Sequence, residues 1–222
     1  ELIHWLNWSP DDRRLAYVAR RGDKWFAVVD GEEGSPFEKV DLPEFTKDSR
    51  HFLYRAKRGG KSVPVLDGKA GGEYDGWADG PWFSEGGGRV ACAAIRDGKQ
   101  IPLVDGEEGN PHDEVRRIVF SKDGEHVGCI VVDGNEYSVV ADGKPGAGYD
   151  KISQGTLVFS PDGNHIAYHA QTDGKPLVVV DKCESPRYDR ILARRPAFDA
   201  QGTVDFLAIR DMTLYRVVIS SQ

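Results

Sequence analysis

The chain has 222 residues, 39% of them hydrophobic, and a formal net charge of −7 at pH 7. This negative charge argues against nonspecific nucleic-acid binding, which depends on cationic surfaces that face the phosphate backbone. No apolar run approaches the roughly 20 residues that a membrane-spanning helix needs, so we predict no membrane span.

A short pattern recurs six times along the chain, at intervals of 37 to 39 residues. Each copy starts with an aromatic residue that is followed by a polar turn. The six copies begin Trp8-Ser9-Pro10-Asp11, Phe45-Thr46-Lys47-Asp48, Phe83-Ser84-Glu85-Gly86, Phe120-Ser121-Lys122-Asp123, Phe159-Ser160-Pro161-Asp162 and Phe198-Asp199-Ala200-Gln201. A fixed period of this length indicates one supersecondary unit repeated, in which each unit buries its apolar face against its neighbours.

The fifth copy shows the order of elements most clearly. Residues 157–159 form a short apolar strand, which is followed by the strong turn sequence of residues 160–163. Further strands are predicted over residues 165–170, 177–180 and, shorter and more polar, 187–191. Four strands therefore fill each copy, and no stretch shows the periodicity of a helix.

The other copies repeat these strands and share the turn that follows the third strand. This turn is an Asp-Gly pair, which tolerates the positive φ of a tight hairpin. It occurs at Asp30-Gly31, Asp67-Gly68, Asp105-Gly106 and Asp142-Gly143. The predicted fourth strand carries an aromatic–acid pair, as at Tyr74-Asp75, Tyr149-Asp150 and Tyr188-Asp189.

The sixth copy stops after its third strand, at residues 214–219, and the N-terminus carries a matching extra segment. Ile3 precedes Trp8 by the same number of residues as Val40 precedes Phe45, so residues 1–4 are expected to supply the missing fourth strand. The sequence thus predicts an all-β, six-bladed β-propeller, closed by its N-terminal strand, because closure removes open sheet edges. The single domain spans residues 1–222, with blades near residues 5–41, 42–79, 80–116, 117–154, 155–193 and 194–222 plus 1–4. An open, solenoid-like array is the alternative, although the polar caps of such arrays are missing.

The repeat resembles that of a known family. Phe159-Ser160-Pro161-Asp162-Gly163, with the strands Ile166-Ala167-Tyr168 and Val178-Val179-Val180 and the turn Asp173-Gly174-Lys175, resembles the bacterial repeat of TolB-like and WD40-like propellers. This resemblance covers nearly the whole chain and implies six four-stranded blades. The separate N-terminal domain of TolB is not found in this sequence, so the role of TolB is not transferred. The resemblance favours a periplasmic or other extracytoplasmic location, and a start at Glu1 is expected of a processed form or of a domain from a longer protein.

The segments that join consecutive copies differ from one copy to the next, unlike the turns elsewhere. In a propeller they surround the mouth of the central channel, where they form the predicted binding site. Its candidate residues are Trp5, Asn7, Asp41, Glu44, Trp77, Asp79, Arg116, Arg117, Gln154, Arg194 and Arg195. Trp and Arg often dominate protein interfaces, so two Arg pairs facing Asp41 and Asp79 favour a protein or peptide partner. The alternative is structural, with the indoles packed between blades and the Arg residues in ion pairs.

Charge differs between the two sets of hairpin turns. The turns between second and third strands carry an excess of bases, including Arg20, Arg21, Lys57 and Arg58, whereas the turns after the third strand are acidic. An acidic partner of the basic turns is therefore one hypothesis. Simple solvation of charged turns is the other.

Enzymatic functions have weaker support in the sequence. A metal-dependent hydrolase or lactonase would place several oxygens on calcium, but Asn7, Asp41, Glu44, Asp79, Gln154 and Thr156 stand at unequal offsets in their copies. No zinc-binding spacing and no phosphate-binding glycine loop occurs, so no metal site and no cofactor is predicted. His51, His126 and His165 occupy one repeated surface position, and Cys92 and Cys129 another, apolar one. The predicted function is a non-catalytic binding scaffold; an accessory propeller of a larger peptidase or sensor protein is a further alternative.

Overall fold

The structure is a computed structural model that describes residues 2–220, apart from the side chain of Leu42. It consists of two compact units, Glu1–Gly109 (unit 1) and Asn110–Gln222 (unit 2). The described residues form β-strands joined by turns, with one short 3₁₀ segment and no α-helix. The predicted all-β class is therefore confirmed. No helix in residues 2–220 is long and apolar enough to cross a membrane.

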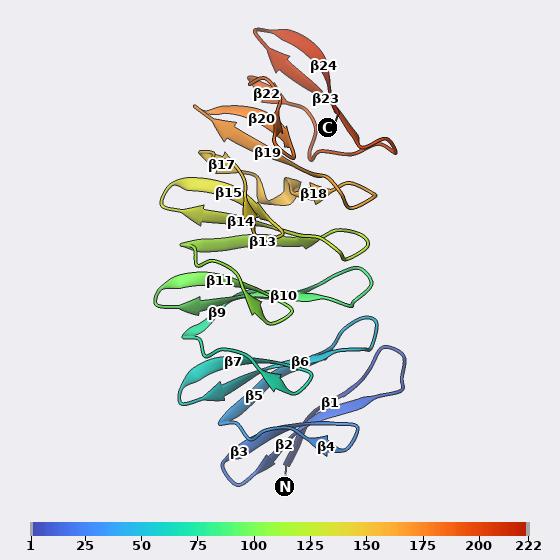
Figure 1. The fold of residues 1–222 in the computed structure, drawn as a ribbon, viewed down its shortest axis with the longest axis vertical. Coiled ribbons are helices and arrows are strands. Elements are labelled where there is room, and N and C mark those ends of the chain that lie inside the picture. The colour runs from blue at the N-terminus through green and yellow to red at the C-terminus, as the bar shows by residue number, and fades with distance from the viewer. Residues whose placement is uncertain (1, 221–222) are drawn as a thin grey trace. The chain divides into compact units, whose positions relative to one another are not determined.

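Unit 1 contains three four-stranded antiparallel sheets, one from each of the first three sequence repeats (Figure 1). Within each sheet the strands lie in chain order, and the fourth strand has only two residues. The first sheet is β1 (Leu2–Trp8), β2 (Leu15–Arg21), β3 (Lys24–Val29) and β4 (Glu32–Glu33). The second is β5 (Lys39–Phe45), β6 (Phe52–Arg58), β7 (Lys61–Leu66) and β8 (Lys69–Ala70), and the third is β9 (Gly76–Phe83), β10 (Val90–Arg96), β11 (Lys99–Val104) and β12 (Glu107–Glu108).

Unit 2 contains the sheets of the last three repeats, which vary more. The fourth sheet is β13 (Glu114–Phe120), β14 (Val127–Asp133), β15 (Glu136–Ala141) and β16 (Lys144–Pro145). In the fifth sheet the 3₁₀ segment η1 (Gln154–Thr156) divides the first strand into β17 (Lys151–Ile152) and β18 (Val158–Phe159), followed by β19 (Ile166–Thr172), β20 (Lys175–Val180) and β21 (Cys183–Glu184). The sixth sheet has three strands, β22 (Arg190–Ile191), β23 (Thr203–Arg210) and β24 (Thr213–Ser220).

The first strand of each of the first four sheets is longer than the sequence indicates, because its ladder continues through an irregularity. In β5, Val40 pairs with Ala56 and Phe45 pairs with Phe52, with a shift in register between them. A β-bulge of this kind bends the strand but keeps it in its ladder. The segment assigned to a preceding fourth strand is therefore the beginning of the next sheet.

The same pairing corrects the prediction for the N-terminus. Leu2 and Ile3 pair with Arg20 and Ala19, so they open the first sheet and are not the fourth strand of the sixth sheet. The register equivalence of Ile3 and Val40 is confirmed, because both stand opposite the same position of the second strand. The strand exchange predicted at the N-terminus is thus wrong, and ring closure stays a proposal.

The chain crosses from one sheet to the next within the aromatic–acid pair. Tyr74 makes a single bridge to Ser62 in the second sheet, and the backbone N–H of Asp75 already donates to the carbonyl of Ile95 in the third. The other repeats cross in the same way, as the bridge between Tyr149 and Tyr137 shows. The predicted fourth strand at these pairs is therefore limited to the aromatic residue.

The acid of each pair binds the hairpin of the next sheet. Its carboxylate accepts hydrogen bonds from backbone N–H groups of the turn between the second and third strands. The contacts run from Glu38 to Gly59 and Gly60, Asp75 to Asp97, Asp113 to Gly134, Asp150 to Asp173, and Asp189 to Asp211. We call these contacts the acid caps, and in each of them a carboxylate holds the hairpin that follows it in the chain.

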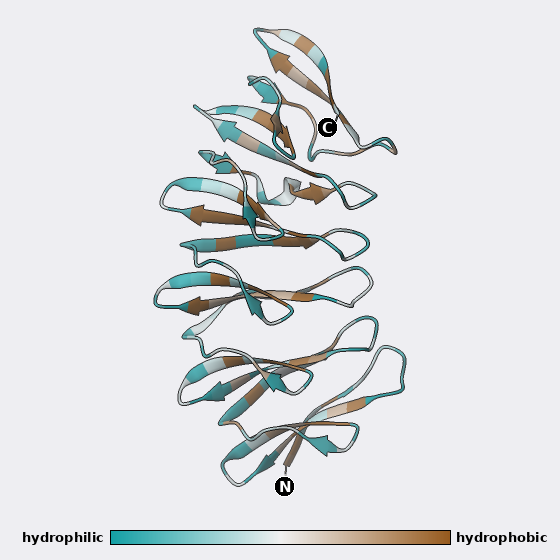
Figure 2. Ribbon diagram, viewed as in Figure 1, coloured by the Kyte–Doolittle hydropathy of each residue, from teal (hydrophilic) through white to brown (hydrophobic). Residues whose placement is uncertain are grey.

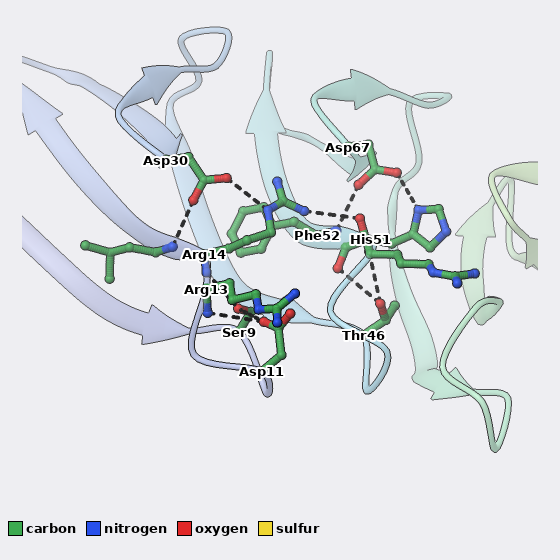
Figure 3. A network of polar contacts seen from close by, with 11 residues as sticks. Ser9, Asp11, Arg13, Arg14, Asp30, Thr46, His51, Phe52 and Asp67 are labelled. Carbon is green, nitrogen blue, oxygen red and sulfur yellow. Dashed lines mark hydrogen bonds and ion pairs between the residues drawn. The ribbon is translucent and has the colours of Figure 1, made fainter.

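A second polar device closes the opposite end of each sheet (Figure 3). Asp30 receives the backbone N–H of Leu15 at 2.9 Å and pairs with Arg14 at 2.9 Å, and Asp67 does the same with Phe52 and His51. Asp105, Asp142 and Asp181 repeat the arrangement in the next three sheets. We call these contacts the Asp clasps, and they show that the first and third turns of a repeat share one end of the sheet.

The Asp residues of the clasps also form their own turns. Asp30 has φ +54° and Gly31 has φ +87°, and the three other predicted Asp-Gly pairs have positive φ at both residues. Tight hairpins of this type need positive φ at both central positions. The turn prediction is therefore confirmed.

The hydrophobic core lies between neighbouring sheets within each unit, and Figure 2 shows apolar residues within the strands and polar residues in the hairpin loops. Val18, Val40 and Tyr54 belong to one cluster that joins the first two sheets, and each is at most 3% exposed. A similar cluster joins the fourth and fifth sheets through Ile152 and Tyr168. Full burial of such a side chain contributes about 1.5–3 kcal/mol, so each repeat depends on its neighbours for stability.

Candidate functional site

The predicted site residues all lie in or beside the irregular part of the first strands. Trp5, Asn7, Asp41, Glu44, Trp77 and Asp79 belong to unit 1, and Arg116, Arg117, Gln154, Arg194 and Arg195 belong to unit 2. Trp5, Arg116 and Arg117 fall inside register shifts of their strands, whereas Asn7, Asp41, Glu44, Trp77 and Asp79 keep partners in the ladder beside such shifts. The predicted convergence of the Arg pairs with Asp41 and Asp79 joins the two units and stays a prediction.

Three of the predicted residues line one pocket in unit 1. Trp5 from the first sheet, Asp41 from the second and Trp77 from the third surround a cavity of ≈ 240 Å³. Arg55, Ala56, Lys57 and Ser62 of the second sheet complete its lining. We call this cavity the indole pocket. Trp5 is 61% exposed and has φ +53°, so the bulge presents its indole to solvent.

Arg55 is a residue of the pocket lining that the sequence analysis missed. Its guanidinium lies 4.9 Å from the centre of the Trp77 ring and donates to the carbonyl of Gly80. A cation over an indole face is electrostatically favourable, so Arg55 and Trp77 hold each other in place. The sequence did contain a signal for Arg55, because this charged residue stands where the neighbouring repeats carry apolar ones. Val18 and Ala93 at the equivalent strand position are fully buried.

The charges of the indole pocket are both positive and negative. Asp41 pairs with Lys39 at 2.7 Å, and Arg55 and Lys57 stand on the same lining. The other bases proposed for an acidic partner are partly engaged by their own sheets. Arg21 pairs with Glu33 at 2.6 Å, and Arg58 lies over the ring of Phe37.

The other predicted residues of unit 1 do not line this pocket. Asn7 donates to the carbonyl of Pro43 at 3.1 Å and so connects the first two sheets. Asp79 accepts the N–H of Gly80 at 2.8 Å. Desolvation raises the pKa of the Glu44 carboxyl group, which does not line the indole pocket. The structure thus supports structural roles for Asn7 and Asp79.

The predicted residues of unit 2 include one engaged Arg residue and several exposed ones. Arg116 pairs with Glu114 at 2.6 Å and lies over the ring of Tyr137. Arg117, Arg194 and Arg195 are exposed and make no ion pair within residues 2–220, and Gln154 is an exposed residue of η1. The ion-pair alternative therefore holds for Arg116, whereas the other three guanidinium groups face solvent.

A larger, more apolar cavity of ≈ 300 Å³ lies on the other side of the Arg55–Trp77 pair, between the second and third sheets. Pro64, Val65 and Leu103 contribute to its walls, together with Cys92. Burial raises the pKa of the Cys92 thiol to about 12, so the thiol is protonated at neutral pH and is a poor nucleophile. All three cysteines are free.

The positions of the histidine, cysteine and acidic side chains decide whether they could hold a metal ion. Within residues 2–220, no group of three or more His, Cys, Asp and Glu side chains is arranged to hold a metal ion. His51, His126 and His165 lie at the predicted surface position, where each bonds the aspartate of its Asp clasp. These histidines therefore help to hold together the two turns at one end of their own sheets.

No protein-family model matches the chain, and no curated protein matches it. Among solved structures, it is similar to TolB from Acinetobacter baumannii, with 15% identity and a TM-score of 0.37 over 94% of this chain and 61% of that one. The β-propeller domain of the Trilobed protease from Pyrococcus furiosus is similar over 97% of this chain and 78% of that one, with 14% identity and a TM-score of 0.38. The Dos1 propeller matches with 13% identity and a TM-score of 0.40 over 94% of this chain and 65% of that one.

These similarities concern the fold, and at TM-scores below 0.5 they carry no argument about a site or an activity. The chain spans less than two thirds of the TolB structure that it matches. The resemblance to TolB-like propellers that the repeat motif indicates is nonetheless confirmed. The chain resembles TolB and other β-propeller structures.

Proposed function

We propose that the protein is a non-catalytic binding scaffold whose indole pocket receives a segment of a protein or peptide partner. One observation carries this proposal: three consecutive sheets place Trp5, Asp41 and Trp77 around one cavity, beside Arg55 and Lys57. Aromatic and Arg side chains in a concave site are typical of residues that dominate interfaces.

The lining defines the chemistry of the partner. The two indoles favour an apolar side chain, and the bases Arg55 and Lys57 favour a neighbouring carboxylate. A peptide with an acidic residue next to an apolar one would satisfy both. The exposed Arg117, Arg194 and Arg195 are candidates for additional contacts with an acidic partner.

Selection from a phage-displayed library of random peptides tests this proposal. We expect the enriched peptides to combine Asp or Glu with a large apolar residue. Trp5→Ala should weaken their binding at least tenfold in fluorescence polarisation, as expected when an interface residue of central importance is truncated. Lys57→Gln should slow association mainly at low salt, because charges at a rim act on the on-rate.

Trp8 provides a matched control on the same strand. Its indole is 55% exposed, close to the 61% of Trp5, but it does not line the indole pocket. Trp8→Ala should leave peptide affinity unchanged. Equal losses in the two variants, or a library that yields no enriched peptide, would contradict the proposed site.

We also propose that the six sheets close into a six-bladed ring. The first and last strands of the chain, β1 and β24, expose apolar side chains. Leu2, Ile3 and Leu6 of β1 are about 60% exposed, and so is Leu214 of β24. Val40, the counterpart of Ile3, is only 2% exposed because a preceding sheet covers it. Contiguous exposed apolar surface usually marks an interaction site, and the two terminal faces are the halves of the interface found between consecutive repeats.

Chemical cross-linking at high dilution tests closure. In a Cys183→Ser background, Leu6→Cys and Val218→Cys provide one exposed thiol on each terminal face. A closed ring brings packed sheets to about 10 Å, so a short bis-maleimide should yield a cross-linked monomer. Cross-linked dimers alone would show head-to-tail association of separate copies, and unlinked monomers would support the open array. An extracytoplasmic location is also proposed, on the resemblance of the repeat motif alone.

A further inference from the structure

A buried hydroxyl group between the first two sheets lacks a partner. Tyr54 is 3% exposed, and within the described residues its phenol oxygen makes no hydrogen bond. An unsatisfied buried polar group costs roughly 1–3 kcal/mol, so such groups are rare and point to a bound molecule or to a special role. The Tyr54 hydroxyl is therefore a buried polar group that the first two sheets leave without a hydrogen bond.

The fourth and fifth sheets show the same arrangement in a complete form. Tyr149 meets Tyr168 edge to face, with ring centres 6.0 Å apart. Tyr149 donates to the carboxylate of Glu184 at 2.8 Å. A second phenol and a carboxylate thus stand at the interface that buries Tyr168.

The first interface keeps the geometry but lacks two of the three polar groups. Phe37 meets Tyr54 edge to face with ring centres 6.2 Å apart, and so takes the place of Tyr149 without its hydroxyl. Ala70, which stands opposite Val65 as Glu184 stands opposite Val179, removes the carboxylate. The missing groups explain why Tyr54 has no partner.

A cavity of ≈ 670 Å³ opens at this point, within unit 1. Gly34 lies on its wall, and a Cβ atom built there would stand 3.3 Å from the Tyr54 hydroxyl, so the hydroxyl lies next to this part of the wall. Ala27, Val29 and Phe52 supply apolar surface. The size is within the range of small-molecule sites, and charged side chains make up much of the lining.

The charged groups of the lining narrow the choice of ligand. Arg14 is paired with Asp30 at 2.9 Å, Glu33 with Arg21 at 2.6 Å, and Asp67 is bonded to His51, so these groups are already engaged. Glu32 from the first sheet and Lys69 from the second make no ion pair among the residues that the structure describes. The cavity thus offers one carboxylate and one ammonium group, from opposite sheets.

We propose that this cavity, the Tyr54 pocket, binds a small zwitterion with an apolar body, that is, a free apolar amino acid. Its carboxylate accepts a hydrogen bond from the Tyr54 hydroxyl and faces Lys69, while its ammonium group faces Glu32. Its side chain lies on Val29 and Phe52. The ligand carboxylate then provides the function that Glu184 has at the complete interface, and the site is separate from the indole pocket.

Calorimetric titration with L-leucine tests the proposal, with two analogues that each lack one charge. 4-Methylpentanoate lacks the ammonium group, and 3-methylbutylamine lacks the carboxylate. We expect leucine to bind with a dissociation constant of roughly 0.1–1 mM, and each analogue at least about tenfold more weakly. Lys69→Gln should remove the preference of the protein for leucine over the amine, and Glu32→Gln the preference for leucine over the acid.

Two variants separate binding from folding. Tyr54→Phe removes the unpartnered hydroxyl, so it should weaken leucine binding about tenfold without lowering the melting temperature. Phe37→Tyr with Ala70→Glu rebuilds the polar chain of the other interface, and it should raise the melting temperature while abolishing leucine binding.

Three results would overturn the inference. The first is no saturable heat with leucine up to ~10 mM, which would indicate a merely hydrated cavity. The second is equal affinity for leucine and both analogues, which would exclude recognition of a zwitterion. The third is leucine binding that survives in both Tyr54→Phe and the rebuilt double variant, which would place the ligand elsewhere.

Discussion

At the scale of single residues, the same strand position explains two unusual side chains. Val18, Ala93 and Ile130 are fully buried there, but the second and fifth repeats carry Arg55 and His169 instead. Arg55 finds a partner in an indole, whereas the Nε2 atom of His169 is buried without a hydrogen bond. Desolvation therefore disfavours the charged imidazole and lowers the pKa of His169 to about 4.

This lowered pKa predicts a loss of stability in mild acid. The unfolded chain binds a proton at His169 near pH 6.5, whereas the folded chain resists protonation until about pH 4. The contribution is complete above pH 6.5 and is lost as the pH falls through this window. We expect His169→Val to reduce the drop in unfolding free energy between pH 7 and 4.5 by on the order of 2 kcal/mol in urea titrations. His4→Val, a change on the exposed β1, is the control; identical pH profiles for wild type and His169→Val would refute the assignment.

At the scale of the elements, the turns could be predicted and the first strands could not. The Asp-Gly pairs define their hairpins locally, because few other residues adopt two successive positive φ angles. The first strands depend on a ladder that resumes after a bulge, and no local periodicity marks such a resumption. Residues near Val40 therefore read as the end of one repeat, although backbone pairing with Ala56 makes them the start of the next.

The candidate site was predictable to a similar degree. Trp5, Asp41 and Trp77 could be selected because joining segments that differ among copies are not explained by turn geometry. Arg55 was missed because it lies inside a strand whose other copies are apolar. The Tyr54 pocket could not be predicted, since it follows from the combined loss of two groups on different sheets, Tyr at position 37 and Glu at position 70.

The Asp clasps allow a direct test of this local logic. Asp142 has φ +47°, accepts the N–H of Val127 at 2.9 Å and bonds His126 at 2.7 Å. Asp142→Gly keeps the backbone conformation but deletes both contacts, so urea unfolding should show a loss of about 1–2 kcal/mol. Asp142→Asn keeps an acceptor for the N–H and tolerates the positive φ, and it should lose less than half as much. A larger loss in the Asn variant would mean that the backbone contact is unimportant.

At the scale of the whole molecule, stability is shared between neighbours. Each unit buries its core between adjacent sheets, and each acid cap bonds the hairpin that follows it in the chain. Repeat proteins of this kind gain stability from nearest-neighbour interfaces. The acid caps add a direction to that rule, because the carboxylate always precedes its hairpin in the chain.

This direction predicts that the two ends of the chain tolerate truncation differently. Removal of residues 190–222 leaves every remaining hairpin with its cap. Removal of residues 1–38 deletes Glu38 and so exposes the backbone N–H groups of Gly59 and Gly60. We expect the first deletion to lower the melting temperature less than the second in calorimetry. Glu38→Gln in the full chain, which keeps an acceptor, should have a smaller effect than either deletion.

The same asymmetry bears on synthesis at the ribosome. A nascent chain emerges with its N-terminus first, so the carboxylate that will hold a hairpin is always made before the hairpin itself. Each newly released β-hairpin can therefore bond at once to a carboxylate that has already left the ribosome, without waiting for distant sequence. The acid caps can thus form in the order of translation.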